Sequence, residues 1–145
     1  MSSRPDALPQ TLTLDGKHYD LARLSTTARA QLPHLQFAEG QIQRLSNRNA
    51  IAETARLAYV RALADNLPEK KASANRKKNV ITVDDERYWL EDFSEAARAQ
   101  LYHIRVVEAE QEQLNKELAM ARTARNHYVA VLKQELKGVK PLQTQ

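Results

Sequence analysis

The chain has 145 residues, a net charge of +4, few glycines and no cysteine. The absence of cysteine excludes disulfides, thiol catalysis and cysteine-based metal sites. The 28% of charged and 6% of aromatic residues favour long helices over a sheet-rich fold. No stretch approaches the 18 apolar residues of a transmembrane helix, and the first ten residues lack the apolar segment of a secretory signal. We therefore expect a cytoplasmic protein that does not insert into a membrane.

The segment "ARAQL" occurs at residues 28–32 and again at 97–101. Extending this match without a gap aligns residues 12–63 with 81–132 and gives 21 identities over 52 positions. Agreement of this length is far beyond chance, so the sequence predicts a tandem duplication. The expected organisation is a disordered N-terminal tail at 1–11, module one at 12–65, a basic linker at 66–80, module two at 81–137 and a C-terminal tail at 138–145.

Each module opens with a short alternating run around a turn, "LTLDGKHYDL" at 12–21 and "ITVDDERYWL" at 81–90. Asp15-Gly16 is a strong signal for a type I′ hairpin, because both central residues of that turn need positive φ. Asp84-Asp85 is a weaker turn signal. A hairpin this short is marginal in water, so we expect each one to pack on another element.

After Ser25 and Ser94, which we predict to be helix N-caps, the apolar period changes from two to 3.5 residues. No Gly or Pro interrupts residues 94–137, so module two predicts one long helix. In module one, Pro33 should bend or delay the helix, because it removes a backbone hydrogen bond. Residues 46–49 are a second soft point at which a helical hairpin is a less favoured alternative.

A narrow apolar stripe needs a partner helix, and the helix of the other module is available. The predicted fold class is mostly α with small β: two tandem β-hairpin plus long-helix modules whose helices pair as an antiparallel coiled coil. The residues expected to line this pairing are Leu32, Leu35, Ile42, Leu45, Leu63, Leu101, Ile104, Leu114, Leu118 and Leu132.

Four charged residues lie on the same stripe, one pair in each module. An antiparallel register that sets Glu39 beside Arg125 also sets Arg56 beside Glu108. Two ion pairs would then fix the alignment of the helices. Two alternatives stay open: the charges flank the interface with their heads in solvent, or the helices pair between two chains.

The repeated block resembles a family of short bacterial and bacteriophage proteins of unknown function. The residues that carry the resemblance are "TLDGKHYDLARLSTTARAQL", "AETARLAYVRAL" and "ARTARNHYVAVL". Members of that family have about one copy of the module, with an opening I-x-I-D/N-G-K-x-Y hairpin before a coiled-coil helix. The resemblance implies a hairpin-plus-helix fold that self-associates, and it transfers no catalytic or binding residue. Module two departs from the pattern at Asp84-Asp85.

Neither metal binding nor catalysis has a signal in this sequence. There is no His-x₃-His pair, no Gly-rich phosphate loop and no ordered catalytic triad, so we expect no metal, no cofactor, no small-molecule substrate and no enzymatic activity. His34 and His103 are equivalent in the two modules and are expected at the surface or at an interface.

The linker is the one segment that could bind a polyanion. Its cations are Lys70, Lys71, Arg76, Lys77 and Lys78. They could contact phosphates, but no aromatic residue lies among them to stack on bases. The sequence therefore favours a structural or adaptor protein that binds other proteins, or a second copy of itself, through coiled-coil surfaces. The alternative is a nucleic-acid-binding accessory protein that uses the linker.

Overall fold

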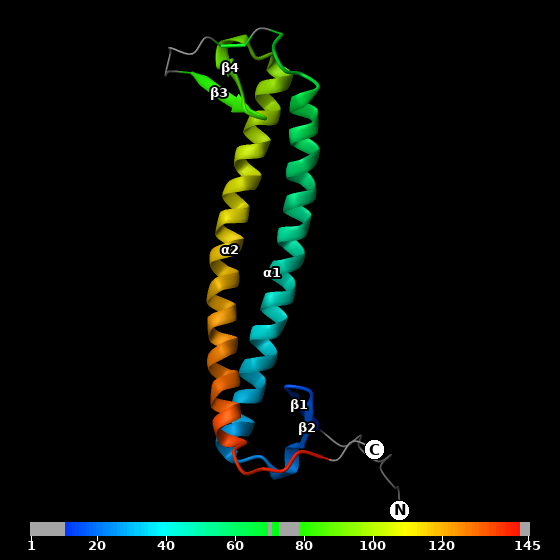
Figure 1. Ribbon diagram of the computed structural model, residues 1–145, viewed down its shortest axis with the longest axis vertical. Helices are drawn as coiled ribbons and strands as arrows, with labels where there is room; N and C mark the ends of the chain where they lie inside the picture. The colour runs from blue at the N-terminus through cyan, green and yellow to red at the C-terminus, as the bar shows by residue number, and fades with distance from the viewer. Residues whose placement is uncertain (1–10, 70, 73–78, 143–145) are drawn as a thin grey trace, which may run out of the picture. The chain divides into compact units, whose positions relative to one another are not determined.

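The computed structural model describes residues 11–69, 71–72 and 79–142 (Figure 1). The first elements along the chain are β1 (Thr11–Leu14), β2 (Lys17–Asp20), the 3₁₀ turn η1 (Leu21–Arg23) and α1 (Thr26–Ala64). The same order returns in β3 (Val80–Val83), β4 (Glu86–Trp89), η2 (Leu90–Asp92) and α2 (Glu95–Glu135). The fold is mostly helical, with two small antiparallel hairpins, and none of the described helices is long and apolar enough to cross a bilayer.

Both hairpins close through the predicted turns. Asp15 and Gly16 have φ of 51° and 74°, and Asp84 and Asp85 have φ of 48° and 65°. Positive φ at both central residues is the mark of a type I′ turn, whose twist matches that of the flanking strands. The turn predictions are therefore confirmed. Asp85 occupies the position that glycine fills in the first hairpin, so its Cβ makes this conformation costly.

Both long helices begin immediately after the serine predicted to cap them. The Oγ of Ser25 accepts a hydrogen bond from the N–H of Ala28 at 3.1 Å, and the Oγ of Ser94 accepts one from Ala97 at 3.1 Å. Each bond satisfies a backbone donor that has no partner within the first helical turn. The two N-cap predictions are confirmed.

Pro33 does not delay α1, so the expectation of a delayed helix start was wrong. The helix begins at Thr26 and runs through Pro33 and through residues 46–49 without a break. Proline removes only the one hydrogen bond that its N–H would have donated to the carbonyl of Arg29. On either side of Pro33, Leu32 is half-buried and Leu35 is buried. The packing of these two leucines stabilises the helix where that hydrogen bond is missing.

The chain divides into two compact units that cut across the predicted modules. Unit 1 combines Met1–Gln43 with Ala119–Gln145, and unit 2 is Arg44–Leu118. Within each unit, the beginning of one long helix packs against the end of the other (Figure 1). The contacts run in antiparallel order.

In unit 1, Ser25 Oγ donates to Glu135 Oε2 at 2.8 Å, and His34 lies against Tyr128. Residues near the start of α1 therefore meet residues near the end of α2. In unit 2, Tyr59 near the end of α1 lies against His103 near the start of α2.

One apolar cluster holds each unit together. The buried members in unit 1 are Tyr19, Leu24, Ala28, Leu35, Leu132 and Leu136. Those in unit 2 are Leu63, Val83, Tyr88, Phe93, Ala97 and Ile104. Five of the six positions in the first cluster have a counterpart 69 residues away in the second, as Tyr19 has Tyr88 and Leu132 has Leu63. In both clusters, a hairpin and the helix after it are closed by a leucine from the end of the other helix.

The two hairpin turns make a matched pair for mutagenesis. We expect Asp85→Gly to increase the free energy of unfolding by about 0.5–1 kcal/mol, because glycine adopts positive φ without steric cost. Gly16→Ala should decrease it by about 1 kcal/mol. A Cβ at Gly16 would meet nothing within 4 Å, so backbone conformation alone opposes that change. Urea unfolding checks both values, and shifts of the same sign in the two variants would contradict the assigned turns.

Candidate interaction surface

The ten apolar residues predicted to line the helix pairing are buried or half-buried. The seven buried residues are Leu35, Leu45, Leu63, Ile104, Leu114, Leu118 and Leu132. Leu32, Ile42 and Leu101 are half-buried. Because the fold encloses most of their surface, a partner has to contact other residues.

In each unit an imidazole from one helix stacks on a phenol ring from the other. The ring centroids of His34 and Tyr128 are 5.4 Å apart with an interplanar angle of 24°. Those of Tyr59 and His103 are 4.9 Å apart at 25°. Sequence reasoning put the two histidines at a surface or interface but did not pair them with the tyrosines. The available signal was that His and Tyr are both identical between the modules.

Unit 2 contains a charged network centred on Glu53, which sequence reasoning missed. The carboxylate accepts hydrogen bonds from Arg56 Nη2 and Nε at 2.8 and 2.9 Å, and from Nε2 of Gln111 on α2 at 2.7 Å. The bond from Arg56, followed by that from Gln111, lowers the pKa of Glu53 to about 2. The hydrogen bond and charge of Glu53 raise the pKa of Arg56, and the charge of Glu108 adds a smaller contribution.

The predicted register charges thus lie in different surroundings. Arg56 is hydrogen-bonded to Glu53 on its own helix, while Glu108 acts on it through charge. Arg125 donates to Oδ1 of the adjacent Asn126 from Nε at 3.4 Å and from Nη2 at 3.2 Å. Within the described part of unit 1, no ion pair joins Arg125 to Glu39.

Four of the five cations of the basic linker fall outside the described residues. Lys71 is described, and its Nζ lies 3.1 Å from Oε1 of Glu86 on β4. The other four predicted nucleic-acid contacts, Lys70, Arg76, Lys77 and Lys78, lie outside the described residues.

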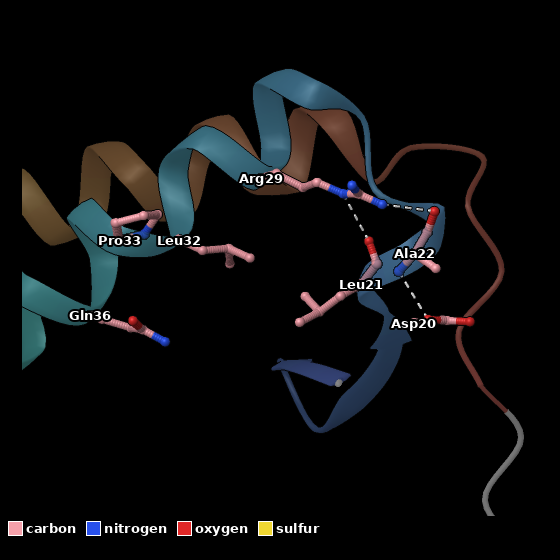
Figure 2. Close-up of a pocket in the computed structure, with 7 residues that line it drawn as sticks. All are labelled: Asp20, Leu21, Ala22, Arg29, Leu32, Pro33 and Gln36. Atoms are coloured by element: carbon pink, nitrogen blue, oxygen red, sulfur yellow. Dashed lines mark hydrogen bonds between the residues drawn. The ribbon is translucent and has the colours of Figure 1, made fainter. Parts of the chain in front are cut away.

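Unit 1 has an open cavity of about 520 Å³ beside η1 and α1 (Figure 2). It is lined by Asp20, Leu21, Ala22, Arg29, Leu32, Pro33 and Gln36. Arg29 donates from Nε to the carbonyl of Leu21 and from Nη2 to the carbonyl of Ala22, both at 3.1 Å. The N–H of Ala22 donates to Oδ1 of Asp20 at 3.0 Å. The two bonds of Arg29 join η1 to α1, and the bond of Asp20 caps η1, so both charged side chains of the cavity stabilise the local fold.

A smaller groove of about 200 Å³ lies between α1 and α2 of unit 2. We call it the unit 2 groove; its lining residues are Arg48, Ile51, Ala52, Ala55, Val107 and Glu110. Arg48 Nη2 is 3.1 Å from Glu110 Oε1, which joins the two helices. Ile51 is 70% exposed, and Val106, next to the lining Val107, is 48% exposed. The groove therefore presents apolar side chains beside one positive and one negative charge.

Exposed apolar residues recur at equivalent positions of unit 1. Phe37 is the counterpart of Val106 at the 69-residue offset, and Met120 is the counterpart of Ile51. Phe37 is 68% exposed and Met120 is 65% exposed. Both modules thus keep large apolar side chains in solvent at the same two helix positions.

Among the described residues, no group of three or more His, Cys, Asp or Glu side chains could hold a metal ion. No known protein family, curated protein or solved structure matches the chain. A function therefore has to be inferred from the surface of this chain alone.

Glu53 makes stability depend on pH in one window. Its pKa is about 2 in the folded chain, against an ordinary value of 4.5. As the pH falls from 4.5 toward 2, the unfolded chain binds a proton that the folded chain does not, so the carboxylate's contribution to stability is lost. At neutral pH that contribution is fully present.

We expect Glu53→Gln to flatten the decline of thermal stability between pH 4.5 and 2, followed by circular dichroism. The control is Glu112→Gln, which removes an exposed carboxylate 3.5 Å from Lys116 and should leave the slope near that of the wild type. A Glu53→Gln variant that loses stability as steeply as the wild type would contradict this role.

Proposed function

We propose that this chain is a non-enzymatic, cytoplasmic adaptor or assembly protein that binds other proteins through the exposed surface of its paired helices. The unit 2 groove is the observation that carries the proposal. Single exposed apolar residues are common on soluble proteins. Ile51, however, lies 70% exposed in an open groove whose other lining residues include Ala52, Ala55 and Val107.

The chemistry of the groove suits a helical partner. Ala52 and Ala55 have small side chains, so another backbone can approach α1 closely there. Ile51 and Val107 supply the apolar contact, and Arg48 and Glu110 supply charges that can fix orientation. A groove of this kind receives an amphipathic helix with apolar residues at i, i+3 and i+4.

The finer architecture belongs to the same proposal: two duplicated modules whose helices form an antiparallel coiled coil. The buried residues of α1 support it: Leu35 follows Ala28 by seven residues, Ala38 follows Leu35 by three, and Leu45 and Ala52 each follow at a further seven, which is the spacing of a heptad pattern. The matching membership of the two apolar clusters at an offset of 69 residues supports the duplication.

Affinity capture tests the adaptor function. The tagged full-length chain is expressed in its native cell, and its co-purifying proteins are identified by mass spectrometry with and without nuclease. We expect stoichiometric protein partners that survive nuclease and that are lost with Ile51→Lys, because the contact would take the lysine ammonium out of water and replace an apolar contact with a charge. Leu57→Lys is the matched control, since Leu57 is 49% exposed on the same helix but does not line the groove.

Two results would contradict the proposal. Partners that bind Ile51→Lys as well as they bind the wild type would show that binding does not use the unit 2 groove. Partners that disappear with nuclease would favour the alternative function, nucleic-acid binding through the linker cations.

A further inference from the structure

We infer that the unit 2 groove docks against the same groove of a second copy of this chain, forming a two-fold symmetric dimer. This inference rests on the proposed function and names one partner for it. A two-fold interface brings a surface onto itself, so the surface must be self-complementary. The residues of the groove meet that condition in both charge and apolarity.

The charges are complementary across the proposed interface. Arg48 lies on α1 and Glu110 on α2. Their charged groups lie at the same level along the helix axes, because Nη2 and Oε1 are 3.1 Å apart. With the two grooves face to face around an axis parallel to the helices, α1 of one copy lies over α2 of the other. Arg48 then faces Glu110 of the second copy, and Glu110 faces its Arg48.

The apolar side chains lie in register in the same arrangement. Ile51 follows Arg48 by three residues, and Val107 precedes Glu110 by three. Because the two helices are antiparallel, both side chains are displaced in the same direction from the ion pair, by about 4.5 Å. Ile51 of one copy therefore faces Val107 of the second copy, and the contact removes the 70% exposed Ile51 from water.

The opposite stacking is disfavoured by the same residues. If α1 lay over α1 of the second copy at this height, Arg48 would meet a second Arg48 and Glu110 a second Glu110. Like charges placed together in an interface oppose association. The groove thus selects one of the two face-to-face arrangements, which gives a bundle of four helix segments at this level.

Charge reversals in separate chains test the contact directly. Wild-type protein should be a dimer by sedimentation equilibrium. Arg48→Glu leaves only negative charges at the groove, and Glu110→Arg leaves only positive ones, so each variant alone should dimerise about tenfold more weakly or worse. An equimolar mixture of the two variants should recover dimers, because the introduced glutamate of one chain faces the introduced arginine of the other.

The mixing experiment separates the interface from the ion pair inside each chain. That internal pair stays repulsive in both variants, so recovery in the mixture can come only from contacts between chains. Lys116→Glu is the control, since it reverses an exposed charge of α2 outside the groove and should remain dimeric. Ile51→Glu is a further test at a 70% exposed position, where folding does not depend on the side chain, and it should be monomeric.

Each other outcome overturns the inference. Wild-type protein that stays monomeric up to its solubility limit excludes the self-association, while partners retained in the capture experiment would leave the adaptor function standing. A wild-type dimer whose single variants remain dimeric uses another surface. Single variants that become monomeric without recovery in the mixture lose association for a reason other than facing charges.

Discussion

The closing of each apolar cluster by a leucine from the opposite helix is the contact on which the rest of this structure depends. Leu132 is fully buried in the apolar cluster of unit 1, and Leu63 is only 2% exposed in the apolar cluster of unit 2. A ten-residue hairpin and one helix cannot enclose Tyr19 and Ala28 without Leu132. Loss of a buried leucine side chain costs about 2–5 kcal/mol, so neither unit tolerates the absence of the other helix.

This arrangement also determines what remains for a partner. Within each unit the leucines and the stacked His–Tyr pair occupy the facing sides of the two helices, and the hairpin packs on the same cluster. Side chains away from that contact, such as Ile51 and Val106, are left in solvent. The proposed binding through the unit 2 groove rests on these side chains, which the described pair of helices leaves outside its apolar contact. The proposed docking of a second copy rests on the same physical argument.

Local chemistry made much of the fold predictable. The turn at Asp15-Gly16 and the two serine N-caps depend on interactions with residues close by in the sequence. The turns and the helix starts could therefore be predicted. Pro33 was misjudged because packing at Leu32 and Leu35 outweighs one lost hydrogen bond. The Glu53 network was missed because it is not repeated: module two has Arg122 at the position of Glu53, and module one has Ile42 at that of Gln111. The groove depends on the distance between helices, which no periodicity gives.

Fragment complementation tests the central claim, that the helix of one module completes the core of the other. The chain is divided into residues 1–75 and 76–145, and helix content is followed by far-UV circular dichroism at low micromolar concentration. We predict that each fragment alone loses most of its helical signal, because its cluster lacks the closing leucine, and that the equimolar mixture regains the signal of the intact chain. A monomeric fragment of residues 1–75 that keeps the full signal expected from the 39 residues of α1 would contradict the account.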